Sequence, residues 1–174
     1  MSIDSKALLA KLMASENLVI EQRKVRTAMF DVVNRVLIVP MLDKNIPSHT
    51  YDLFMGHEVG HALFTPKNMT ELERNRKVNR GLANIVDDAR IERKIKIKYP
   101  GLRNSFIKGY KDLLDRNFFE LEGRDVNKLN FVDRMNLFFK CGILLDINFS
   151  DDEKKILQKV ELTETYDEVL DVCE

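Results

Sequence analysis

The sequence predicts a mostly helical α+β protein with one small sheet near its N-terminus. Two observations predict this class: β-branched and aromatic residues dominate residues 18–39, and apolar residues recur at helical spacing through most of the remainder. The chain has 174 residues, enough to bury a core, and its 28 basic and 28 acidic side chains leave no net charge. Neutrality argues against a dedicated nucleic-acid or membrane-surface protein, because both bind through a basic excess.

The elements of the N-terminal part are expected in the following order. Residues 4–16 carry an apolar stripe opposite lysines, which predicts a short amphipathic helix. Residues 18–39 predict a small antiparallel meander, with a turn formed by the polar residues 31–34. A loop with capping side chains then leads to a helix over residues 50–64, which Pro66 ends.

The rest of the chain is helical in pattern. A long helix is expected over residues 78–98, because its apolar stripe stops at Tyr99-Pro100-Gly101. Further helices are expected over residues 102–119, 130–146, 151–160 and 163–172, and Ser150 with Glu153 has the capping-box spacing that starts the third of these. We therefore expect a core of residues 1–100 with a helical subdomain of residues 101–174 packed on it.

Charge and cysteine usage add weaker expectations. The last 25 residues contain nine acids and three lysines, so a tail of −6 balances a body of +6, and we expect the tail to be a solvated acidic face. Cys141 and Cys173 form no CxxC pair and are expected to be reduced thiols. No apolar run approaches the roughly 18 residues of a membrane-spanning helix, and the N-terminus lacks a signal-peptide pattern, so we expect a cytoplasmic protein.

Two of the three histidines stand in the segment HEVGH, which begins at His57 and ends at His61. Positions i and i+4 of a helix project from one face, so both imidazoles can bind one cation, and Glu58 then lies close to metal-bound solvent. This is the HExxH arrangement of zinc sites. The alternative is an amphipathic helix whose histidines are satisfied by ordinary hydrogen bonds.

A catalytic zinc takes three protein ligands and keeps one position open, so the chain has to supply a third ligand. His49 lies just before the helix and would have to fold back over its N-terminus. Asn84, Asp88 and Glu92 follow one edge of the next long helix at i, i+4 and i+8. Asp88 could bind the metal, and Glu92 could accept a hydrogen bond from a liganding histidine. Asp87 is the rival ligand, and an exposed acidic edge paired with basic neighbours is the alternative.

The segments HEVGHALFTP and NIVDDARIE together resemble the zincin metallopeptidases. The resemblance is to peptidases encoded by tailed phages and to metallopeptidase-like regions found beside von Willebrand A domains and in cobaltochelatase-subunit-like proteins. It extends upstream through FDVVNRVLIVP and downstream through NFVDRMNLFFKCG, and so covers the chain up to about residue 142.

This resemblance implies a zincin-like fold and a zinc site carried by helices. It implies that His57 and His61 bind zinc, that Glu58 is the catalytic base, and that an acid of the second helix is the third ligand. Relatives keep an aspartate at the position of Asp88 more consistently than an acid at that of Asp87. It also implies an edge strand, RVLIVP or TAMF, that aligns the substrate.

The expected activity is zinc-dependent hydrolysis of a peptide or protein substrate, in the host cytoplasm if the chain is phage-encoded. A partner protein or von Willebrand A-type domain is an expected partner. The oxyanion of the reaction needs a second electrophile, for which the sequence offers His49, Tyr51, Arg90 and Tyr110. Gly60 would let another backbone approach the helix closely, or is an ordinary helical glycine.

Two other functions stay open. One is a zinc-stabilised interaction module that binds partner proteins without proteolysis. The other is nucleic-acid binding through residues 90–98, which contain five basic side chains and one acid. Alternating lysine and isoleucine in that segment more often marks a helix with one solvated face, so nucleic-acid binding is the weaker alternative.

Overall fold

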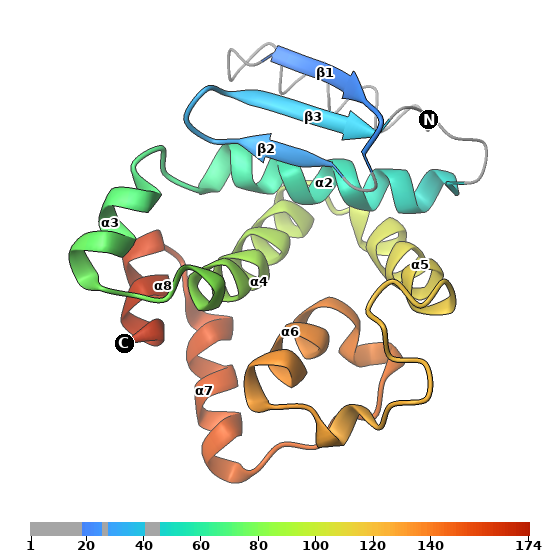
Figure 1. Ribbon diagram of the computed structural model, residues 1–174, viewed down its shortest axis with the longest axis vertical. Coiled ribbons are helices and arrows are strands. Elements are labelled where there is room, and N and C mark those ends of the chain that lie inside the picture. Colours follow the sequence, from blue (N-terminus) through green and yellow to red (C-terminus); the bar gives the residue numbers. More distant parts are fainter. Residues whose placement is uncertain (1–18, 26–27, 41–45) are drawn as a thin grey trace. The chain divides into compact units, whose positions relative to one another are not determined.

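The computed structural model describes residues 19–25, 28–40 and 46–174, and it confirms a mostly helical α+β protein with one small sheet (Figure 1). The helix expected over residues 4–16 lies outside the described residues. The strands are β1 (Val19–Arg23), β2 (Met29–Asp31) and β3 (Val36–Pro40). The helices are α2 (Ser48–Phe64), α3 (Met69–Arg76), α4 (Arg80–Lys98), α5 (Leu102–Asp115), α6 (Phe131–Cys141), α7 (Asp151–Leu162) and α8 (Tyr166–Cys173), with two single 3₁₀ turns at Val126–Lys128 and Gly142–Leu144.

The sheet is mixed, so the expected antiparallel meander is wrong. The strand order is β1-β3-β2: β2 pairs with β3 in antiparallel fashion, whereas β1 pairs with β3 in parallel, with Val19 opposite Val36. A meander pairs each strand with the next one, but here the third strand enters between the first two. Alternating side chains predict a strand but carry no information about its neighbour. Because β3 is paired on both sides, the segment RVLIVP is no edge strand, and only β2 of the two expected candidates lies at an edge.

The turn that joins β2 to β3 confirms the expectation for residues 31–34. One carboxylate oxygen of Asp31 accepts hydrogen bonds from the backbone N–H groups of Val33 and Asn34, at 3.0 and 2.9 Å. Arg35 then takes the left-handed conformation, with φ of 59°. An aspartate at the start of a turn provides this bonding through its own side chain, which is why the local sequence was sufficient to predict it.

Helix α2 carries the HEVGH segment and packs beneath the sheet, as Figure 1 shows. Leu37 and Val39 alternate along β3 and are buried, with 0% and 1% of their surface exposed. The helix begins two residues before the expected start and ends at the expected Phe64. Its buried side faces a packed interior, so the two histidines are held on a helix whose orientation is set by that core.

Glycines let α2 approach its neighbours closely. A Cβ atom at Gly60 would lie 2.8 Å from Ile91 Cδ1 and 3.3 Å from the Ile91 carbonyl oxygen, so Ile91 would have to shift to admit one. A Cβ atom at Gly56 would similarly lie 2.8 Å from the ring of Phe106 on α5. The close-packing role considered for Gly60 is therefore confirmed, and it brings the HEVGH helix against α4.

The long helix α4 ends at the expected Lys98, whereas the expectations for the segments on either side of it, α3 and α5, need correction. Helix α3 was not expected, because its sequence MTELERNR is polar almost throughout; it ends where Lys77 takes the left-handed conformation. Helix α5 ends at Asp115 rather than at residue 119, and Asn117 with φ of 55° lies in the turn that follows. The helical spacing of apolar residues continues beyond Asp115, although the backbone is no longer helical there.

The last helices begin where their capping residues stand. The Ser150–Glu153 capping box at the start of α7 is present as expected, with both reciprocal hydrogen bonds formed. Thr165 and Glu168 form a second capping box at the start of α8. Helix α6 ends at Cys141 and a 3₁₀ turn follows, so the expected helix to residue 146 is shorter.

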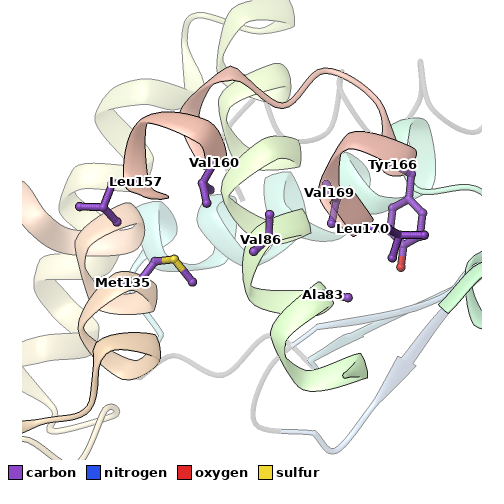
Figure 2. Packing of buried hydrophobic residues seen from close by; sticks show 8 residues of the cluster. All are labelled: Ala83, Val86, Met135, Leu157, Val160, Tyr166, Val169 and Leu170. Carbon is purple, nitrogen blue, oxygen red and sulfur yellow. The ribbon is translucent and has the colours of Figure 1, made fainter. Parts of the chain in front are cut away.

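The chain divides into two compact units, each made of two segments. One contains residues Met1–Lys67 and Ile91–Asp112, and the other contains Asn68–Arg90 and Leu113–Glu174. The second unit has a continuous apolar core, which Figure 2 shows from close by. Its buried members come from α4, α6, α7 and α8: Ala83, Val86, Met135, Leu157, Val160, Tyr166, Val169 and Leu170.

Candidate metal centre

The two histidines of α2 lie side by side, one helical turn apart. Their ring centroids are 4.9 Å from each other and the ring planes meet at 77°. Both side chains are half-buried. This arrangement follows from the local sequence, because residues four apart on a helix project from the same face.

Each histidine uses its Nδ1 atom in a hydrogen bond to the protein. His57 Nδ1 lies 2.9 Å from Glu92 Oε1, and His61 Nδ1 lies 2.9 Å from Thr65 Oγ1. A carboxylate can only accept, so Nδ1 of a neutral His57 carries the proton and its lone pair is on Nε2. A metal ion would therefore be bound through Nε2, and the Nδ1 contacts fix the orientation of both rings.

Glu92 is the buried hydrogen-bond partner of His57. Only 2% of its surface is exposed. The hydroxyl of Tyr110 on α5 donates a hydrogen bond to Glu92 Oε1, the same oxygen that contacts His57. A buried carboxylate is costly unless hydrogen bonds compensate its lost hydration, and these two contacts provide such bonds at Oε1 but not at the buried Oε2.

Asp88 stands one turn before Glu92 on α4, which is a continuous helix at this point. Together with His57 and His61, Asp88 makes a group in which one potential ligand atom of each residue lies within 4.8 Å of the others. The Asp88 carboxylate is half-buried, and one of its oxygens accepts a 2.7 Å hydrogen bond from the Lys140 ammonium group of α6. Asp88 and Glu92 thus lie one turn apart on α4, the spacing from which the sequence predicts a ligand and a histidine's partner.

The rival ligand Asp87 is placed differently. It is 2% exposed and forms an ion pair with Arg90, which is also 2% exposed. Arg90 Nε and Nη2 donate to one oxygen of Asp87 at 2.9 and 2.6 Å, and Arg90 Nη1 donates to the backbone carbonyl oxygen of Glu164 at 3.2 Å. Asp87 thus serves a buried ion pair of the second unit, and Asp88 is the acid that accompanies the histidines.

The remaining acid and amide of the expected site lie on the same two helices. Glu58 follows His57 on α2 and is half-buried, about 100° around the helix from it. Asn84 is exposed, one turn before Asp88 on α4. A half-buried carboxylate beside the histidines can exchange protons with solvent in the site.

The four residues considered for the oxyanion differ in their surroundings. Tyr51 is buried, and burial together with the charge of Asp52 raises the pKa of its hydroxyl. Arg90 and Tyr110 are buried in the contacts described above. His49 is half-buried in the first turn of α2, so the expectation that it lies in a loop before the helix is wrong. His49 is thus the one of the four that combines partial exposure with a ring able to donate a hydrogen bond.

Two residues of the site were missed by sequence reasoning. Thr65 follows His61 by four residues, a spacing at which a helical side chain can reach back, so this partner had a local signal. Lys140 lies 52 residues beyond Asp88 and had none. A lysine on an amphipathic helix is ordinarily solvated, so only the tertiary structure brings it to an aspartate.

Comparisons with protein-family models, with curated proteins and with solved structures give no match for this chain. In the part of the chain that the structure describes, no helix is both long and apolar enough to cross a bilayer. Because no known protein matches, the side chains of the site are what indicate its chemistry.

Proposed function

We propose that this protein is a zinc-dependent metallopeptidase of the zincin type, with His57, His61 and Asp88 as the metal ligands. The observation that carries the proposal is the convergence of two imidazoles and one carboxylate within 4.8 Å. Two nitrogen ligands and one oxygen ligand suit Zn²⁺, and a set of three protein ligands keeps a coordination position for water or substrate.

The hydrogen bonds around the ligands support a metal site in preference to a packed histidine pair. Both Nδ1 atoms already have protein partners, so both rings direct the same kind of atom, Nε2, to a cation. Three carboxylates, of Glu58, Asp88 and Glu92, accompany the two imidazoles on α2 and α4, and Lys140 balances the charge of Asp88. A divalent cation would offset the remaining negative charge.

The proposed reaction is hydrolysis of a peptide bond. A bound zinc ion would polarise the scissile carbonyl and lower the pKa of water in the site. Glu58 would accept a proton from the attacking water as the C–O bond forms, and would return it to the amine nitrogen when the C–N bond of the tetrahedral species breaks, so that Glu58 ends in its starting state. Glu92 and Thr65 would hold the two imidazoles in place throughout.

The substrate is proposed to be a peptide or protein. The strand β2 lies at an edge of the sheet and has 49% of Met29 exposed, so an extended peptide could be aligned along it. A separate partner domain, of the von Willebrand A type by resemblance, could present such a substrate. The cytoplasm is the proposed location of the reaction, a reducing compartment that suits the thiols of Cys141 and Cys173.

The test measures metal content and hydrolysis on the same purified samples. The wild-type chain should contain one zinc ion, whereas His57→Ala and Asp88→Ala should lose it. Glu58→Gln should retain zinc and lose hydrolysis of a mixed peptide library by about 10²- to 10⁴-fold, the usual contribution of a general base. A metal-free wild type, or full zinc in both ligand variants, would contradict the proposal.

The same samples distinguish the interaction-module alternative. That alternative gains support if the wild type binds zinc but hydrolyses no peptide, so that Glu58→Gln changes nothing.

The nucleic-acid alternative is weakened by the surroundings of its basic segment, residues 90–98. Arg90 is buried with Asp87, and the ammonium groups of Lys94 and Lys96 lie over the rings of Phe64 and Phe106, at 5.5 and 5.3 Å from the ring centroids.

A further inference from the structure

We infer that Tyr110 is a positioning residue of the metal centre: it holds Glu92, and through Glu92 it sets the tautomer and orientation of His57. This inference rests on the proposed function, because it assumes that His57 is a metal ligand. It assigns Tyr110 a role different from the oxyanion contact that the sequence suggested.

The contacts form one chain of hydrogen bonds through three helices. The Tyr110 hydroxyl on α5 donates to Glu92 Oε1 on α4, and the same oxygen lies 2.9 Å from His57 Nδ1 on α2. Glu92 and Tyr110 are 2% and 5% exposed, so water does not compete for these contacts. Each link has a single direction, because a hydroxyl and an imidazole N–H both donate to the carboxylate.

The Tyr110 hydroxyl helps to keep the carboxylate of Glu92 in place. Glu92 is buried, so losing this donor removes part of what compensates the carboxylate for its lost hydration. Without the Tyr110 hydroxyl, the Glu92 carboxylate could turn toward another donor. A displaced Glu92 no longer requires the proton of His57 to be on Nδ1, so His57 would present Nε2 to the metal in only part of the molecules.

An oxyanion role does not fit the same atoms. A group that stabilises an oxyanion must direct its proton into the space where the substrate reacts. The Tyr110 hydroxyl instead directs its proton to a carboxylate inside the protein, behind the ring of His57 as seen from Nε2. Its aromatic ring is packed edge-on against Phe106, with centroids 6.2 Å apart, which keeps the hydroxyl at that depth.

Tyr110→Phe is the direct test, and the chain offers a matched control. The substitution removes one oxygen atom and retains the ring. Tyr166 has a closely similar environment in the other unit: it is 7% exposed and its hydroxyl donates to the buried Glu73 at 2.6 Å. Tyr166→Phe therefore removes the same kind of hydrogen bond at a place that has no histidine in its hydrogen-bond chain.

Zinc affinity is measured by competition with a chromophoric chelator on the full chain. Tyr110→Phe should raise the zinc dissociation constant about tenfold, the lower end of what the loss of an outer hydrogen-bond partner causes. Tyr166→Phe should leave it unchanged, although both variants lower the denaturation midpoint. Equal zinc affinity in Tyr110→Phe and wild type, or equal weakening by the two substitutions, would overturn the inference.

A second measurement needs no metal. The ¹⁵N shifts of His57 in the metal-free wild type at neutral pH should identify Nδ1 as the protonated nitrogen, and Tyr110→Phe should reduce the population of that tautomer. If Tyr110→Phe does not fold, Glu92→Gln takes its place and should weaken zinc binding, and unchanged affinity there overturns the inference too. A wild type that binds zinc without hydrolysing peptides refutes the proposed function and leaves the role of Tyr110 intact, so the two failures are distinguishable.

Discussion

Although Asp87 and Asp88 are adjacent, we expect their replacement by alanine to affect different properties, namely folding stability for Asp87 and metal binding for Asp88. Asp87 is paired with Arg90 in the interior, with both side chains at most 3% exposed. Asp88 is paired with Lys140 at a place where 18% and 15% of the two side chains remain exposed. Asp87→Ala should therefore damage folding, and Asp88→Ala should damage metal binding.

The magnitudes follow from burial. Asp87→Ala leaves the Arg90 guanidinium with the Glu164 carbonyl oxygen but without its carboxylate, and removal of one partner of a buried pair costs about 3–5 kcal/mol. For a chain of this length, a loss of that size lowers the denaturation temperature by about 6–20 °C. Asp88→Ala breaks a pair that water can reach in part, so its cost should be about 1 kcal/mol or less.

The assay is urea denaturation followed by circular dichroism, with a chelator present so that bound zinc does not add to stability. Zinc content is then measured without chelator on the folded fraction of each variant. Asp87→Ala should be strongly destabilised yet keep its zinc when folded, and Asp88→Ala should be nearly as stable as wild type and metal-free. The reversed pattern would show that Asp87 is the ligand and would refute the argument from burial.

Two further predictions concern the helical C-terminal part. Ser150→Ala and Thr165→Ala each remove the side-chain acceptor of a capping box. Each should lower the free energy of unfolding, measured by chemical denaturation, by about 1 kcal/mol. A loss below a few tenths of a kcal/mol would contradict the assigned caps. Hydrogen bonds from the Arg134 guanidinium and, to a smaller extent, from the backbone N–H of Ser150 hold the pKa of Glu153 below its usual value of 4.5. The ionised carboxylate therefore stabilises the fold at a pH above 4.5, and this contribution is lost as the pH falls through the lowered pKa. Arg134→Gln should raise the pKa of Glu153 in an NMR titration, and the stability difference from wild type should shrink as the pH falls below 4; a difference that stays constant with pH would contradict the assignment.

Features that depend on a few consecutive residues were predictable. The Asp31 turn, the Ser150–Glu153 capping box and the pairing of His57 with His61 on one helix face all arise from contacts within four residues. The partnership of Glu92 with a histidine was also predictable, because a liganding imidazole generally donates its other N–H to a carboxylate or carbonyl oxygen. These contacts are set by backbone geometry that the same residues adopt in many folds.

Helix α3 and the strand order could not be predicted from the local sequence. The α3 sequence has almost no apolar stripe, so its helix is stabilised by the elements it packs on, and Tyr166 of α8 donates to Glu73 at its buried side. The parallel pairing of β1 with β3 places residues 19 and 36 opposite each other. The alternation of side chains along one strand does not determine which strand it pairs with.

The amino-acid sequence by itself determined that two imidazoles share a helix face, and that acids follow one edge of a later helix. Burial, which the local sequence does not show, distinguishes the two adjacent acids: Asp87 is enclosed with its one-turn neighbour Arg90, whereas Asp88 has a potential ligand atom within 4.8 Å of those of His57 and His61. The tertiary structure also decided that Tyr110 supports Glu92, and that Lys140 reaches Asp88. The physical reason is separation along the chain: helical spacing relates residues one turn apart, whereas contacts between residues 18 or 52 positions apart exist only once the helices have packed.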